Sequence, residues 1–250
     1  MARRIELDDE AYPACLRELR DPPRTLHVEG TLPSLERAVA IVGTRRVDAA
    51  GLRFARELAS DLARAGCTIV SGGAHGIDTA AHEGALDVGG ATIAVLPSRL
   101  DEPYPPRNRL LFEHIAATGA LLGEHELEPV RYASVFLARN RLIAALARIT
   151  IVVQAPVQSG ALSTAAHARK LGRPLMAVPF APWEVRGAGC LELLAEGALM
   201  LRSSADVLAQ IAPEQPPAPR RTRAVFGDED QQVVHDALAR GQLTVDALCD

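Results

Sequence analysis

Several kinds of residue and motif are scarce in this chain of 250 residues, and each shortage narrows the choice of protein class. No run of about 18 uncharged apolar residues occurs, so we expect no membrane span. The first ten residues turn acidic at once, which is unlike a signal peptide. The four cysteines, Cys15, Cys67, Cys190 and Cys249, lack the spacing of metal ligands. These absences together predict a cytoplasmic protein in a reducing compartment.

Lysine is almost missing as well, because Lys170 is the only one and the other cations are arginines. The formal net charge is -4, so the surface as a whole does not attract polyanions. Any anion binding must therefore come from a local patch, where arginine suits bidentate contacts with phosphate. Aromatic residues are only 4% of the chain, which predicts a minor role for base stacking.

Sequence motifs of catalysis are also lacking. There is no Walker A sequence, no G-x-G-x-x-G run, no nucleophile elbow and no His-Glu-x-x-His. Glu124 is the best isolated acid, and a carboxylate without a partner is weak support for hydrolysis. We therefore expect a non-catalytic protein without a cofactor.

What the chain does contain is a repeated alternation of short apolar runs and helical patterns. Such alternation predicts an α/β fold with a mostly parallel sheet, helices on both faces and right-handed crossovers. The expected strands are Ala38–Val42, Thr68–Val70, Thr92–Leu96, Ala120–Leu122, Ile149–Gln154, Leu175–Val178 and Leu199–Leu201. The expected helices are 49–65, 77–88, 107–118, 133–147, 160–171, 188–196 and 203–211.

Changes in composition divide the chain into four parts. Residues 1–33 form a preface that is too short to fold alone and is expected to pack on the core. Residues 34–211 hold the alternating pattern, and residues 212–227 are a linker rich in proline and arginine. Residues 228–250 read as the helical opening of a small module, which is incomplete in this chain.

The most informative segment is the glycine loop, Ser71-Gly72-Gly73-Ala74-His75-Gly76-Ile77-Asp78. It follows an apolar strand pattern and leads into a helix, which is the layout of an anion site. Glycines allow the backbone to approach a ligand, and the helix start presents free N–H groups to it. We expect phosphate contacts from Ser71, Gly72, Gly73 and Gly76, and a supporting role for Asp78.

Two further strand ends carry similar residues. Gly43-Thr44-Arg45-Arg46 follows the first core strand, and Ser159-Gly160 opens a helix after the fifth. Because parallel strands end at one edge, these segments and the glycine loop predict an extended anion track there. An ordinary strand-to-helix turn and a plain helix cap are the structural alternatives.

The segment Phe136-Leu137-Ala138-Arg139-Asn140-Arg141 adds cations to this track. Arg139 and Arg141 diverge on a helix, so one is expected at the sheet edge and the other outside. The alternative is a buried Asn140 between two surface cations.

A metal site is the remaining possibility near the glycine loop. His75, Asp78 and His82 are three and four residues apart, but no third strong ligand lies close in sequence. We therefore predict no metal and a structural role for His82.

Taken together, the residues resemble the DNA-processing protein A (DprA, also called Smf) family over about 10–208. The similar segments are Tyr12-Pro13 to Pro23, 40–45, 71–78 with Ala81-His82, 92–96, Tyr104-Pro105, Phe136 with 139–141, Ser159-Gly160 with Thr164-Ala165, and Gly197-Ala198. The resemblance implies an extended Rossmann-like domain that binds single-stranded DNA without catalysis. It also implies a homodimer, a RecA partner whose loading it assists during DNA uptake by natural transformation, and a C-terminal winged helix that residues 228–250 would begin.

The chain departs from the family pattern at a few positions. Arg99 stands where the family usually has glycine, Gly123 precedes Glu124 in place of serine, and residues 179–191 lack the usual polar groups. Two other functions therefore stay open. One is a nucleotide-binding or nucleotide-hydrolysing protein, although Ala177-Val178-Pro179-Phe180 lacks the second glycine loop of such enzymes. The other is a scaffold that only dimerises and recruits RecA.

Overall fold

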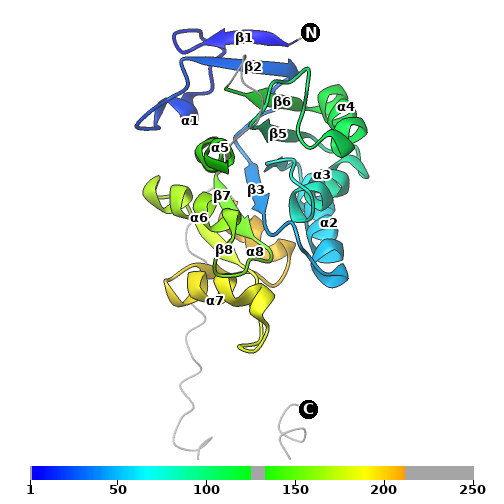
Figure 1. The fold of residues 1–250 in the computed structure, drawn as a ribbon, viewed down its shortest axis with the longest axis vertical. Coiled ribbons are helices and arrows are strands. Elements are labelled where there is room, and N and C mark those ends of the chain that lie inside the picture. The colour runs from blue at the N-terminus through cyan, green and yellow to red at the C-terminus, as the bar shows by residue number, and fades with distance from the viewer. Residues whose placement is uncertain (1, 125–132, 212–250) are drawn as a thin grey trace, which may run out of the picture. The chain divides into compact units, whose positions relative to one another are not determined.

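The structure is a computed structural model that describes residues 2–124 and 133–211 (Figure 1). The chain up to Ile211 forms one compact unit. The expected linker at 212–227 and the expected helical segment at 228–250 lie outside the described residues.

Among the described residues, a nine-stranded sheet is the centre of the fold. Its order is β1-β2-β6-β5-β4-β3-β7-β8-β9. Strands β3 to β9 are parallel to their neighbours in this set, whereas β1 and β2 are antiparallel. The strands are β1 (Arg3–Glu6), β2 (Thr25–Gly30), β3 (Ala38–Val42), β4 (Thr68–Ser71), β5 (Thr92–Leu96), β6 (Ala120–Gly123), β7 (Ile149–Val152), β8 (Leu175–Ala177) and β9 (Leu199–Met200). The predicted α/β fold with a mostly parallel sheet is confirmed.

Two apolar cores lie on the two faces of this sheet. Neighbouring residues of a strand point to opposite faces, so Val39 and Ile41 join one core while Ala40 and Val42 join the other. The first face is covered by α2 (Ala49–Arg64), α3 (Ile77–Leu86), α4 (Arg109–Thr118) and α8 (Ser204–Ile211). The second is covered by α1 (Ala14–Arg17), α5 (Ala133–Leu146), α6 (Gly160–Lys170) and α7 (Ala188–Ala195) (Figure 1). Full burial on both sides explains why the central strands are continuous apolar runs.

The N-terminal residues contribute to the same sheet. Strand β2 lies within the expected preface at 1–33 and pairs with β6. Strand β1 was not expected, because Ile5 is its only buried residue and polar side chains surround it. It is a strand because it pairs antiparallel with β2, and the sequence of β1 alone does not indicate this pairing.

Two 3₁₀ turns complete the described elements, η1 (Pro106–Asn108) and η2 (Val185–Gly187). Within residues 2–124 and 133–211, none of the helices has both the length and the apolar character needed to cross a membrane.

Candidate nucleic-acid interface

A cleft of about 420 Å³ opens at the carboxyl edge of the sheet, where the winding changes direction. The chain proceeds from β3 to β4 on one side, while β7 pairs with β3 on the other. Parallel sheets bind ligands at such switch points. The cleft brings together most of the residues expected from the sequence, namely Gly43, Thr44, Arg45, Asp78, Phe136, Arg139, Asn140, Ser159 and Gly160.

One wall of the cleft is the arginine loop, residues 43–48, which joins β3 to α2. The Thr44 amide donates to the Gln154 carbonyl oxygen at 2.7 Å, and the Arg46 amide donates to Thr44 Oγ1 at 3.1 Å. These bonds fold the loop tightly and leave the side chains of Arg45 and Arg46 exposed. Two guanidinium groups therefore stand at the mouth of the cleft.

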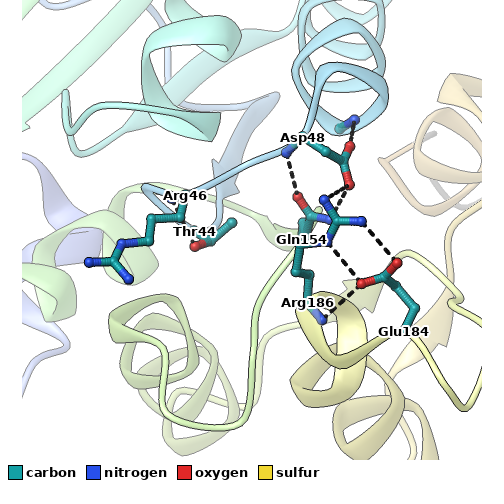
Figure 2. Close-up of polar contacts among 7 residues, drawn as sticks. Thr44, Arg46, Asp48, Gln154, Glu184 and Arg186 are labelled. Atoms are coloured by element: carbon teal, nitrogen blue, oxygen red, sulfur yellow. Dashed lines mark hydrogen bonds and ion pairs between the residues drawn. The ribbon is translucent and has the colours of Figure 1, made fainter.

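Gln154 also holds the far end of this loop (Figure 2). Its Nε2 donates to Asp48 Oδ2 at 2.9 Å, and its Oε1 accepts from the Asp48 amide at 3.3 Å. Asp48 caps α2 by accepting from the Gly51 amide at 2.7 Å, and this bond with that of Gln154 lowers the pKa of the carboxyl. Gln154 thus fixes both ends of the arginine loop, one through its backbone carbonyl and the other through its buried side-chain amide.

Aromatic rings adjoin the first of these arginines. The Arg45 guanidinium lies over the Phe136 ring, 4.8 Å from its centroid. Phe136 meets Tyr104 edge to face, with the centroids 5.6 Å apart. Arg45, Tyr104 and Phe136 line a smaller hollow together with His75 and Arg107. Cations over aromatic faces form a surface on which a nucleobase can stack.

The glycine loop passes so close to its neighbours that a side chain would clash at Gly72, Gly73 and Gly76. Gly76 has φ +89°, and a Cβ there would lie 2.5 Å from the Thr44 carbonyl oxygen. At Gly72 a Cβ would lie 2.7 Å from Arg139 Nη2 and from Asp78 Oδ2. The glycines therefore bring the loop against the arginine loop and against a buried charge pair.

Arg139 holds the glycine loop from below. Its Nη1 donates to the Gly72 carbonyl oxygen at 2.6 Å and also to the Val95 carbonyl oxygen, and only 6% of the residue is exposed. Asp78 accepts from the Ala74 amide at 3.3 Å. The pair ties the ends of β4 and β5 to the start of α3.

Burial shifts the ionisation of these groups. It raises the pKa of Asp78 to about 6, against the opposing effect of the Arg139 charge. It lowers the pKa of Arg139 to about 10. Arg139 therefore remains charged at neutral pH, and Asp78 titrates just below it.

Three expected phosphate ligands have other contacts in the structure. Ser71 is fully buried and donates to the Ile41 carbonyl oxygen at 2.6 Å, which joins β4 to β3. Arg139 bonds to carbonyl groups, as described above. Arg141 lies outside the cleft lining and pairs with Glu124 at 2.6 Å. The two arginines do diverge on α5, but the one at the sheet edge supports the loop from inside.

The start of α6 forms the opposite wall of the cleft. Ser159 caps the helix by accepting from the Ala161 amide at 3.3 Å. Asn140 donates to the Gly160 carbonyl oxygen at 3.1 Å, which joins α5 to α6. Next to Gly160 nothing would obstruct a Cβ within 4 Å, so this wall is open to a ligand.

The histidines near the loop do not form a metal site. His82 is fully buried, and its Nδ1 contacts Thr92 Oγ1 at 2.7 Å. Thr92 itself donates to the Ile69 carbonyl oxygen, so Nδ1 carries the proton, and burial lowers the pKa of His82 to about 3. The described residues contain no cluster of three or more ligands that could hold a metal.

Some residues of the site were not singled out from the sequence. Tyr104 and Arg107 lie on the long connection after β5, and only the folded chain brings them to Phe136. Tyr104-Pro105 was noted as a similar segment, which was the one available signal. Gln154 ends an apolar run and gave no hint of its double bond to Asp48.

Residues 3–212 match the family model described as DNA recombination-mediator protein A. This chain belongs to that family. Protein Smf of Synechocystis is 43% identical over 209 residues, which are 82% of this chain and 52% of the relative. DNA processing protein DprA of Streptococcus pneumoniae is 39% identical over 205 residues, 81% of this chain and 72% of the relative.

Solved structures of the family share the fold. The crystal structure of DNA processing protein A from Streptococcus pneumoniae superposes with a TM-score of 0.80 at 37% identity, covering 85% of this chain and 75% of that one. The protein from Helicobacter pylori, solved for its single-stranded DNA binding mode, gives 0.74 at 35% identity and covers 84% and 95%. The chain spans about half the length of several curated relatives that it matches.

The family departures at 179–191 have a visible structural result. None of these residues is among those lining the larger cleft. The Phe180 ring packs directly on Gly187, where a side chain would have no room. The Phe180 side chain therefore occupies the space next to Gly187.

Proposed function

We propose that this chain binds single-stranded DNA in the cleft and does not transform it. The observation that carries the proposal is the meeting of Arg45, Phe136 and Tyr104 beside the glycine loop, at the switch point of the sheet. A relative of the same family was solved in its single-stranded DNA binding mode. The cleft offers the two things that a single strand needs, which are cations for its phosphates and aromatic faces for its bases.

The cations of the cleft are available for phosphate. Arg45, Arg46 and Arg107 form no ion pair with any acid in residues 2–124 and 133–211, whereas most other arginines near acids do. An arginine without an acidic partner attracts phosphate without first breaking a salt bridge. This local set of charges supports binding in spite of the net charge of -4.

Support for a non-catalytic role comes from the acids. Asp78 is buried and holds the Ala74 amide, while Glu124 is engaged by Arg141 outside the cleft. Asp78 is the only acid among the described residues that line the cleft, so a pair of carboxylates for general acid–base hydrolysis is lacking there. We extend the proposal to a cytoplasmic homodimer that assists RecA loading in DNA uptake.

The test of DNA binding is a titration of a labelled oligothymidine of about 20 nucleotides, a length that exceeds one binding site of this kind. Arg45→Ala should weaken binding about tenfold, because it removes a phosphate contact and the cation over Phe136. The matched control is Arg53→Ala, which removes an exposed arginine of α2 outside the cleft lining and should change affinity less than twofold. Equal effects of the two variants would contradict the proposed site.

The same assay distinguishes the alternative of a small nucleotide. If mononucleotides compete with the oligonucleotide at equal concentration of phosphate, the cleft is a nucleotide pocket and not a strand site. Sedimentation of the free protein tests the dimer, and RecA assembly on single strands with and without the protein tests loading.

A further inference from the structure

The exposed aromatic residues lie on one edge of the sheet. Trp183, the only tryptophan of the chain, is 83% exposed on the connection after β8. Tyr104 is 41% exposed on the connection after β5, and half-buried Phe136 lines the cleft between them in sheet order. The other aromatic side chains whose burial is described pack into the cores; these are Tyr12, Phe54, Phe112 and Phe180.

The loop that carries Trp183 is braced against the arginine loop (Figure 2). Arg186 pairs with both carboxylate oxygens of Glu184, at 2.9 and 3.0 Å, and its Nη1 lies 3.2 Å from Asp48 Oδ2. The Gly189 amide donates to the Ala155 carbonyl oxygen at 2.9 Å, beside Pro156 of the cleft wall. The loop that bears the exposed indole is thus tied to the arginine loop and to the cleft wall.

The strands that carry the cleft and this loop end close enough together for one DNA strand to pass both. β8 is the second neighbour of β3, and strands lie about 4.8 Å apart, so their ends are about 10 Å apart. Stacked nucleotides advance about 3.4 Å each along one strand, so about three of them cover this distance, and fewer when the strand is extended.

We propose that Trp183 is a second stacking surface, which takes a base of the same DNA strand after the strand leaves the cleft beside Arg46. The proposal rests on the proposed function and adds a direction to it, from β3 across β7 to β8. Arg186 pairs with both Glu184 and Asp48, so it offsets part of the negative charge along this path. A solvent-facing indole on a rigid loop gives up little conformational freedom when a base stacks on it.

The single tryptophan makes the test direct. Intrinsic fluorescence should be quenched when an oligothymidine of about 12 nucleotides binds, and should change little with one of about two nucleotides, which at about 3.4 Å each is too short to reach from the cleft to Trp183. Trp183→Ala should weaken binding of the longer oligonucleotide about tenfold and leave the shorter one unaffected. Val185→Ala is the matched control, since this neighbour is 74% exposed but has no ring, and its affinities should stay within about twofold of the parent.

Each other outcome overturns the inference. If both lengths bind, Arg45→Ala weakens them and the fluorescence stays unchanged, the cleft is a DNA site and Trp183 is not part of it. If Trp183→Ala and Val185→Ala both shift the oligomeric state and spare DNA affinity, this surface meets a second copy of the chain. If neither oligonucleotide binds, the proposed function fails first.

Discussion

At the scale of single residues, the buried pair of Arg139 and Asp78 is the most consequential feature. Charged groups are rarely buried without compensation; here each is hydrogen-bonded to backbone groups and lies close enough to the other for their charges to interact. The pair lies under the glycine loop, so its charges set the position of the backbone that faces the cleft. Removing one partner leaves the other buried and unpaired, which is strongly destabilising.

The titration of Asp78 should appear in the stability of the protein. Its pKa in the folded state is about 6, above the value of about 3.9 in an unfolded chain, so its contribution to stability is complete below about pH 4 and is lost as the pH rises through 6. We therefore expect the stability difference between the parent and Asp78→Asn to fall between pH 4 and 7, as measured by urea unfolding. A difference that is constant over this range, or that rises with pH, would refute the assignment.

Phe136 should matter for affinity more than its limited exposure suggests. Phe136→Leu keeps an apolar side chain but removes the π face over which Arg45 lies and against which Tyr104 packs. We expect about a fivefold weaker affinity for oligothymidine, with an unchanged melting temperature, because base stacking contributes on the order of 1–3 kcal/mol. Leu110→Ala, an exposed apolar change on α4, is the comparison that should leave affinity unaltered.

At the scale of elements, the glycine loop shows how local backbone geometry places the site. Its φ value at Gly76 and its contact with Thr44 cannot be met by another residue without movement. The same contact holds β4 and β3 in the arrangement that opens the cleft. The loop therefore depends on close backbone approach more than on side chains.

Gly76→Ala tests this point against a matched glycine. Gly66 also has a positive φ, +79°, but a Cβ there would meet nothing within 4 Å. Gly66→Ala should cost about 1–2 kcal/mol from the left-handed conformation alone. Gly76→Ala should cost more in urea unfolding and should also weaken DNA binding, since the clash with Thr44 displaces the loop. Similar costs for the two variants, with normal DNA binding, would show that the close approach is not needed.

Apolar runs in the sequence predicted the central strands of the fold well. They did not predict the edge strand β1 or the burial of Arg139. Strands buried on both faces are continuous apolar runs, and such runs are easy to recognise. The bounds of β3 to β8 could therefore be predicted to within two residues. β1 could not, because an edge strand with one buried residue has no apolar pattern. The burial of Arg139 was not predictable either, since arginine is mostly exposed and only the folded chain shows which carbonyl groups surround it.

At the scale of the whole molecule, the net charge of the chain and the charge around the cleft have opposite signs. The chain is acidic overall, yet three arginines that pair with no acid among the described residues lie around one cleft and its neighbouring hollow. The sequence predicted this separation in outline, because it placed Arg45 and the glycine segments at one edge. It did not predict Arg107 or Tyr104, whose positions depend on the path of an irregular connection.

Salt dependence measures the number of phosphate contacts. For a single strand the slope of log K against log salt is about -0.7 per contact, so Arg45, Arg46 and Arg107 together predict a slope of about -2. Arg107→Ala should make the slope less negative by about 0.7 in the same titration. A slope near zero in the parent would mean that the cations do not meet phosphate.

The brace that Gln154 provides has a kinetic consequence. Because one interior residue secures both ends of the segment bearing Arg45 and Arg46, by its backbone carbonyl and by its side-chain amide, this part of the receptor has its final shape before any ligand arrives. The rate of capture should then be limited by diffusional encounter, with no slow rearrangement afterwards. Differences in affinity among DNA strands should then arise mainly from differences in their dissociation rates.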